Sequence, residues 1–167
     1  LDEADAELRV ALASFEAVGD VIGASRCKLG LGSVARGRGE FAQGRVWLQE
    51  AETLSAAAGS RIGVAQCKHG LGENHRASGD PAAAEGYYRE ALKTFEALGS
   101  RDQVHCRINR ALCLLALGRP DEARDAFEVG LAQCLERRLV TIRAAVHVFL
   151  LPCFVADNRW SAWDEHL

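Results

Sequence analysis

The order of apolar and polar residues along the chain predicts helices and no strands. Small and apolar residues recur at helical intervals, and no stretch of useful length shows the alternation of a half-buried strand. Glycine interrupts this pattern at regular distances, in several places next to proline or a capping residue. These interruptions divide the chain into nine predicted helices, at residues 2–18, 20–37, 41–58, 61–77, 81–98, 101–117, 120–137, 140–156 and 159–167.

The whole pattern repeats with a period of about 40 residues, which is the sequence signature of stacked supersecondary units. A first set of positions recurs at a spacing of 40: Gly19, Gly59 and Gly99; Cys27 and Cys67; Gly32 and Gly72; Gly39 and Gly79. The next copy arrives 39 residues later, with Ala111 in the place of Gly72 and Gly118 in the place of Gly79. Each period contains two predicted helices, so the chain is a series of helix pairs.

Residues with known capping preferences mark the ends of the helices. Pro81 and Pro120 stand at first helical positions, where the missing N–H of proline costs nothing. The predicted N-caps are Asp20, Ser60, Asp80 and Ser100, and Gln103 completes a capping box with Ser100. Left-handed glycines are expected to close the second helices at Gly19, Gly59 and Gly99. In the last repeat, Arg138 stands where such a glycine is expected.

Small residues also recur in the middle of the predicted helices. Glycine lowers helix propensity, so its return at one repeat position predicts a close contact between helices. We therefore expect Gly72 to lie at such a contact, because its counterparts at the same repeat position are the small residues Gly32 and Ala111.

The residues of the second repeat resemble the tetratricopeptide repeat (TPR) signature, in the run Leu71-Gly72, Gly79, Ala84, Tyr88 and Ala91. The resemblance covers essentially the whole chain and implies an all-α fold, a right-handed superhelix of antiparallel helix pairs. It divides the chain into a second helix of a truncated repeat, three repeats, and an atypical truncated repeat, at 1–19, 20–59, 60–99, 100–138 and 139–167.

The long repeat is similar to TPR arrays in the regulatory tails of bacterial serine/threonine kinases and in transcriptional activators. The runs at residues 109–118 and 151–164 look most like the kinase tails. The resemblance thus implies a regulatory fragment of a larger bacterial signalling protein. The first residue is Leu1, which also suggests a fragment.

Composition excludes several classes of partner. Lys and Arg number 20 and Asp and Glu 23, so a net charge of −3 gives no general attraction to nucleic acid or an anionic membrane. The most apolar stretch, residues 144–156, is too short to span a bilayer. Six cysteines without clustered spacing, and no secretory leader, indicate a reduced cytoplasmic setting. No cofactor is expected.

Candidate chemistry is sparse. Cys27, Cys67 and Cys106 share one repeat position, and neighbouring helices are roughly 10 Å apart, too far for a disulfide. We therefore expect them to be small buried hydrophobic residues. No nucleophile motif, phosphate loop or kinase motif is present, so the chain is predicted not to be an enzyme. The alternative is a metal-binding or enzymatic site formed by His69, Glu73 and His105.

The TPR resemblance implies that the first helix of each pair lines a concave groove, which holds a peptide or helix of a partner protein. The positions that match the groove include Arg26, Arg36, Gln66, His69, Glu73, Arg76, His105, Asn109, Leu112, Leu115, Leu151 and Phe154. This face runs from polar and mildly basic to apolar. The carboxylate clamp of the family is not expected, because Leu29, Ser33 and Gly70 occupy several of its positions. Self-association through the terminal repeats is a further alternative.

Overall fold

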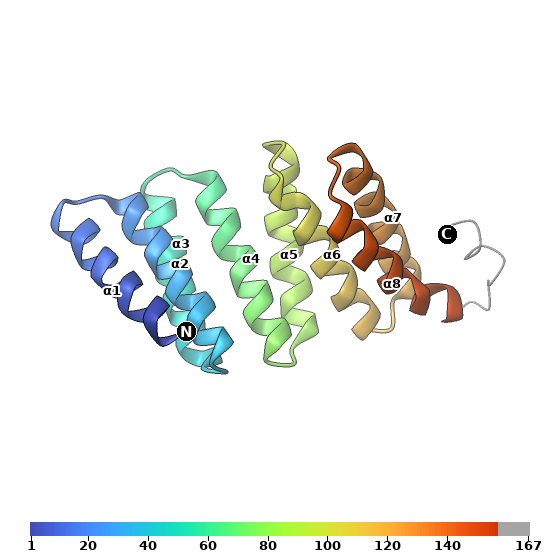
Figure 1. Ribbon diagram of the computed structural model, residues 1–167, viewed down its shortest axis with the longest axis horizontal. Helices are drawn as coiled ribbons and strands as arrows, with labels where there is room; N and C mark the ends of the chain where they lie inside the picture. Colours follow the sequence, from blue (N-terminus) through green and yellow to red (C-terminus); the bar gives the residue numbers. More distant parts are fainter. Residues whose placement is uncertain (157–167) are drawn as a thin grey trace. The chain divides into compact units, whose positions relative to one another are not determined.

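The computed structural model describes residues 1–156, apart from the side chains of Val140, Thr141, Leu151 and residues 154–156. This part forms eight helices: α1 (Asp2–Ala17), α2 (Val21–Gly37), α3 (Phe41–Ala57), α4 (Arg61–Ala77), α5 (Pro81–Ala97), α6 (Asp102–Ala116), α7 (Pro120–Glu136) and α8 (Val140–Ala156) (Figure 1). They agree with the first eight predicted helices to within a residue or two at each end. The ninth, at residues 159–167, lies outside the described residues.

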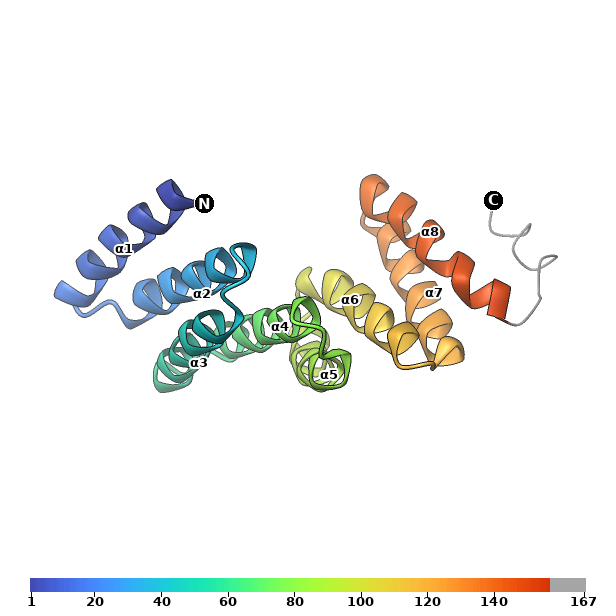
Figure 2. The same cartoon turned by 90° about the horizontal axis from the view of Figure 1, so that it is seen from below.

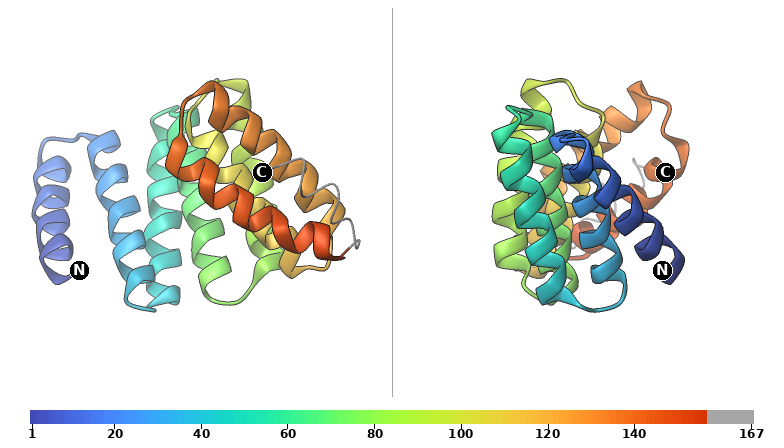
Figure 3. Two further views of the ribbon diagram at one scale, coloured as in Figure 1. Left: turned by 45° about the vertical axis from the view of Figure 1, so that its right-hand side comes forward. Right: turned by 90° about the vertical axis from the view of Figure 1, so that its left-hand side faces the viewer.

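The chain divides into two compact units, Leu1–Ser100 and Arg101–Leu167. In the first unit each helix packs on the next, in antiparallel succession from α1 to α5 (Figure 3). Helix α2 also contacts α4, so the first helices of two successive pairs are neighbours (Figure 2). In the second unit α7 packs on both α6 and α8.

Side chains cap the helices largely as the sequence predicts. Asp20 accepts a hydrogen bond from the Gly23 N–H at 2.9 Å, and Ser60 accepts one from the Gly63 N–H at 3.2 Å. The same interaction at α5 runs from the Ala83 N–H to Asp80, at 3.0 Å. The prediction for α6 is wrong by one residue, because Arg101 and not Ser100 occupies its N-cap position.

Left-handed residues end the helices. Gly19, Gly59 and Gly99 have φ values of +72°, +68° and +61°, which confirms their predicted capping role. Arg138 adopts the same conformation, with φ of +56°, at the place where the repeat pattern expects glycine. A side chain in this region costs about 1–2 kcal/mol, because its Cβ crowds the following carbonyl oxygen.

The small residues lie where helices touch most closely, as predicted. A Cβ on Gly72 would meet the Tyr88 ring at 2.7 Å, and a Cβ on Gly32 would meet Leu48 at 2.6 Å. Ala111, the counterpart in the second unit, is fully buried. The close approach lets large side chains fill the space opposite each small one, and Tyr88 and Leu48 are accordingly buried.

All six cysteines lie in the described part of the chain and are buried there as thiols. Burial raises the pKa of the Cys67 thiol to about 11, so this thiol stays protonated at neutral pH. A protonated, buried thiol is a poor nucleophile and metal ligand. Cys27, Cys67 and Cys106 therefore act as the small core residues that the repeat position predicts.

Candidate functional site

The predicted partner-binding residues of the first unit come from α2 and α4. Arg26, Leu29, Ser33 and Arg36 follow helical spacing along one side of α2, and Gln66, His69, Glu73 and Arg76 do the same on α4. Because α2 and α4 are in contact, these two rows lie next to each other. We call this surface the α2–α4 face.

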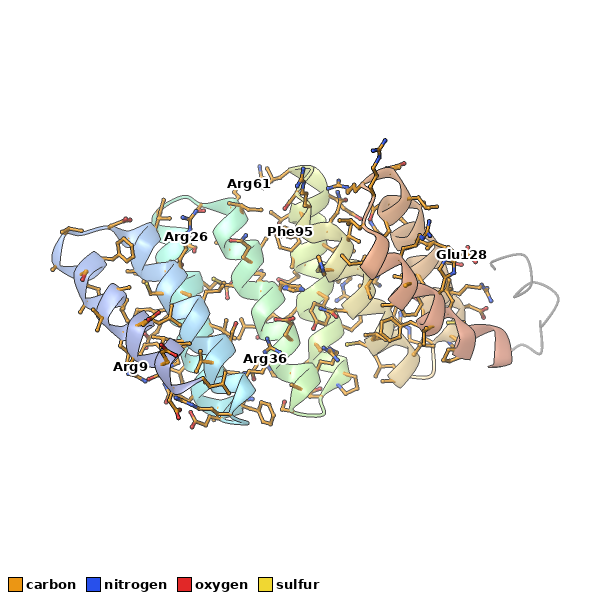
Figure 4. The ribbon with its side chains drawn as sticks, viewed as in Figure 1. Arg9, Arg26, Arg36, Arg61, Phe95 and Glu128 are labelled. Carbon is orange, nitrogen blue, oxygen red and sulfur yellow. The ribbon has the colours of Figure 1, made fainter. Side chains whose placement is uncertain are left out.

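An ion pair joins the two rows. Arg36 points from the C-terminal end of α2 toward α4 (Figure 4), and its Nη2 atom lies 3.2 Å from Oε2 of Glu73. Both side chains are about one quarter to one third exposed, so solvent screens the pair. The positive charge that the sequence offers to a partner at Arg36 is thus compensated within the chain. Arg26 and Arg76 on the same face are exposed.

A hollow of about 50 Å³ opens between the N-terminal halves of α2 and α4. Its lining includes Arg26, Leu29 and Gln66, three residues of the α2–α4 face, together with Ile22 and Ile62. Arg26 and Gln66 come from successive repeats, so the hollow brings equivalent positions of two repeats into one surface. Its size suits the tip of a single side chain.

Two buried serines line the same hollow. The Ser25 hydroxyl donates to the Ala51 carbonyl oxygen at 2.8 Å, and the Ser25 and Ser55 hydroxyl oxygens are 2.7 Å apart. Gly63 makes room for this pair, because a Cβ there would lie 2.6 Å from the Ser55 hydroxyl oxygen. Sequence analysis missed both serines. Gly63 could have indicated them, because a glycine inside a helix suggests a close contact, and here Gly63 on α4 packs against Ser55 on α3.

His69 is turned partly away from the open surface. Its ring centroid lies 5.5 Å from that of Tyr88 and 6.3 Å from that of Phe95, both on α5. The imidazole is half-buried, so only part of it faces a partner. His75, which the sequence places off this face, stacks on Tyr87 at 5.3 Å.

The described residues contain no group of three or more His, Cys, Asp or Glu side chains placed to hold a metal ion. The alternative site named His69, Glu73 and His105. His69 and Glu73 belong to the first unit and His105 to the second, where it is exposed on α6. Glu73 is engaged with Arg36, as described above.

Apart from the exposed His105, the candidate residues of the second unit are less accessible to solvent. Asn109 is half-buried on α6, and Leu112 and Leu115 pack against the core of this unit. That core includes Phe127, Val146 and Leu150. Two further candidates, Leu151 and Phe154, lie on α8, but their side chains are outside the described part of the chain.

No helix in the described part of the chain is long and apolar enough to cross a membrane.

Comparisons with known proteins agree on one family. Two family models, each described as tetratricopeptide repeat, match residues 24–97 and residues 104–128. Together they cover more than half of the sequence. No curated protein matches the sequence significantly.

Solved structures show the same fold at low identity. BtubC (BKLC) from P. vanneervenii is 20% identical, with a TM-score of 0.86 over 99% of this chain and 70% of that one. A Rap protein complexed with Competence and Sporulation Factor is 16% identical, with a TM-score of 0.84 over 93% of this chain and 48% of that one. A Podosopora anserina putative kinesin light chain with nearly identical TPR-like repeats is 15% identical, with a TM-score of 0.76 over 99% and 82% of the two chains.

Proposed function

Because the chain belongs to the tetratricopeptide repeat family, and is a protein-interaction module of that kind, we propose that it binds a peptide or helix of its partner across the α2–α4 face. The observation that carries this proposal is the hollow between α2 and α4, which Arg26 and Gln66 border from two successive repeats. A protruding side chain of the partner enters the hollow, while the exposed cations Arg26 and Arg76 attract acidic groups of the partner.

The module acts without catalysis of its own. Both matching family models describe a tetratricopeptide repeat, and the Glu73 carboxylate on the α2–α4 face is paired with Arg36 rather than with a nucleophilic side chain. The similar Rap structure contains a second molecule, Competence and Sporulation Factor, which supports a binding role for this fold. The partner itself is assigned only by its chemistry, an acidic segment with a protruding side chain.

Charge reversal on the α2–α4 face tests the proposal. Recovery of binding partners from a lysate of the source organism is compared for the wild type and the variants Arg26→Glu, Arg76→Glu and Lys93→Glu. Lys93 is exposed on α5, away from this face, and is the matched control. We expect Arg26→Glu and Arg76→Glu to reduce recovery, more strongly at low salt, with Lys93→Glu without effect. Equal recovery by all four folded proteins would contradict the proposal.

The module is further proposed to be a regulatory part of a larger bacterial signalling protein in the cytoplasm, such as a serine/threonine kinase. The support is the repeat length of about 40 residues and the composition of residues 109–118. The sequence of the complete gene tests this directly. A kinase or other signalling domain in the same reading frame is the expected result, and a gene that encodes only an enzyme of metabolism would contradict it.

A further inference from the structure

A second recess lies on the other side of α2. This cavity, of about 450 Å³, opens between the C-terminal ends of α1 and α3 and the first half of α2. We call it the α1–α3 cavity. Its α2 lining residues are Val21, Ala24 and Lys28, whereas the α2–α4 face carries Arg26 and Leu29. Ala24 and Arg26 are two residues apart, about 200° around the helix, so they face different sides of α2. A further hollow of about 270 Å³, whose lining includes Phe15, Asp20 and Arg26, lies between the two surfaces.

The walls of the α1–α3 cavity are apolar. Phe15 and Leu54 face it from α1 and α3, and Val21 and Ala24 form its side on α2. Its volume falls in the range of ligand pockets, about 300–1,000 Å³, and is large enough for one or two bulky side chains. Val21 is also among the exposed large hydrophobic residues, so the apolar surface reaches the solvent.

The rim of this cavity is acidic. Three carboxylates line it, from Glu16, Asp20 and Glu50, with one ammonium, from Lys28. The Lys28 Nζ atom lies 2.6 Å from Glu50 Oε2, 3.8 Å from Glu16 Oε1 and 5.0 Å from the centre of the Trp47 ring. The ammonium is therefore held and neutralised, and the side chains of Glu16 and Glu50 remain about half exposed. The rim attracts a cation.

The next repeat provides an internal comparison. The equivalent space there measures about 220 Å³, roughly half the volume, and its lining is Ala56, Gly59, Ser60, Arg61, Val64 and Thr94. Six equivalent positions line both sites, and five of them differ: Glu16 for Ala56, Asp20 for Ser60, Val21 for Arg61, Ala24 for Val64 and Leu54 for Thr94. Together they widen the α1–α3 cavity, make its walls more apolar and turn its rim from basic to acidic. A shared fold does not require these changes, and a ligand with both an apolar and a cationic group explains them together.

We propose that the α1–α3 cavity is a second docking site, for an amphipathic helical segment of a partner protein. An apolar side chain of that segment enters between Phe15 and Leu54, and a Lys or Arg one turn away pairs with Glu16 at the rim. This site differs from the α2–α4 face in both position and charge preference. It selects a basic partner, whereas the α2–α4 face selects an acidic one.

Binding of defined peptides tests the second site. The probe is an acetylated, amidated helical peptide of about 15 residues, built from alanine and lysine with two leucines four positions apart. A second peptide replaces every lysine by glutamate. Methyl resonances of the protein are followed by NMR during titration. We expect the lysine peptide to shift the Val21 and Leu54 methyl signals, and the glutamate peptide to bind at least about tenfold more weakly. Absence of binding by the lysine peptide at millimolar concentration would overturn the proposal.

The variants that test the cavity are taken from the equivalent site in the next repeat. The double variant Ala24→Val/Leu54→Thr installs residues that the equivalent site in the next repeat already accommodates, so we expect it to fold. It should bind the lysine peptide at least about fivefold more weakly. Glu16→Ala should reduce the preference for lysine over glutamate. Arg76→Glu, an exposed position near the end of α4 that does not line the cavity, should change neither quantity. Equal binding by the double variant and the wild type would overturn the proposal. A dimer found by sedimentation would also overturn the proposal if its formation shifts the Val21 and Leu54 methyl signals. That result would assign the cavity to a second copy of the chain.

Discussion

Arg36 on α2 and Glu73 on α4 are 37 residues apart in the sequence, and their side chains meet at 3.2 Å near the C-terminal ends of the two helices, on the surface proposed to bind a partner. The pair links the first helices of two successive repeats. Of the two exposed cations of the α2–α4 face, Arg76 lies one turn beyond Glu73 on α4, whereas Arg26 lies in the first half of α2. A partner therefore meets positive charge at Arg26 and Arg76, while the charge of Arg36 is compensated by Glu73.

A double-mutant cycle on this pair should give a small coupling energy. Because Arg36 and Glu73 are partly exposed, we expect a contribution to the free energy of unfolding of about 0.2–1 kcal/mol, which decreases as salt is added. Urea denaturation of Arg36→Ala, Glu73→Ala and the double variant measures it. A coupling of several kcal/mol would show instead that the pair holds the two repeats together.

Gly72→Leu should destabilise the first unit by overpacking. A Cβ at Gly72 already falls 2.7 Å from the buried Tyr88 ring, so a larger side chain forces the helices apart, at about 1–3 kcal/mol or more. Gly86 on α5 is the matched control, because a Cβ there meets no atom within 4 Å. Gly86→Ala should stabilise the protein by about 0.5–1 kcal/mol through helix propensity. The unfolding free energies of both variants from urea denaturation check the assignment, and an unchanged value for Gly72→Leu would contradict the close contact.

Arg138→Gly should stabilise the second unit. The left-handed conformation of Arg138, at φ of +56°, is one that glycine adopts without strain. The gain is smaller than the full strain of about 1–2 kcal/mol, because glycine also increases the entropy of the unfolded chain. The converse variant, Gly79→Ala, should be destabilising although no atom lies within 4 Å of its Cβ, because φ at Gly79 is +86°. Thermal denaturation of both variants gives the comparison, and opposite signs are the expected result.

Acid should weaken α5 at its N-terminus. The Ala83 N–H that donates to the carboxylate, assisted by His75, holds the pKa of Asp80 below its usual value of 3.8. A lowered folded-state pKa means that the stabilisation is present above pH 3.8 and is lost as the pH falls through the lower folded value. Asp80→Asn keeps a capping oxygen and removes this titration. Its unfolding free energy should therefore fall less between pH 5 and pH 2 than that of the wild type, and parallel profiles would contradict the assignment.

Helix positions, caps and small-residue contacts could be predicted from the sequence because each depends on neighbouring residues or on the repeat phase. The cap at Asp80 before Pro81 and the close helix contact at Gly72 are examples. The pairing of Arg36 with Glu73 could not be predicted from the sequence, because it depends on how α2 is rotated against α4 and on the rotamers of two long side chains. The ring contacts of His69 with α5 have the same origin. The sequence pattern thus identifies which residues share a helix face, whereas the contacts that their side chains make are found only from the packed structure.

A substitution at Leu112 tests whether this residue of α6 belongs to the core or to the partner-binding groove. The sequence places it in the groove, while the structure shows it half-buried and packed against the core of the second unit. An aspartate at this position would put a charge in a largely apolar contact, so Leu112→Asp should lower the unfolding free energy by about 1–3 kcal/mol. His105→Asp, at an exposed position on the same helix, is the control and should have little effect.

Hydrogen exchange distinguishes the two roles of Leu112. If the side chain belongs to the core, Leu112→Asp should speed amide exchange across α6, α7 and α8, because these helices share one apolar cluster. Exchange in α2 to α5 should be unaffected, since those helices form the other compact unit. Unchanged exchange in both units, together with a faster release of the partner, would instead show that Leu112 faces the groove and that its loss acts on binding alone.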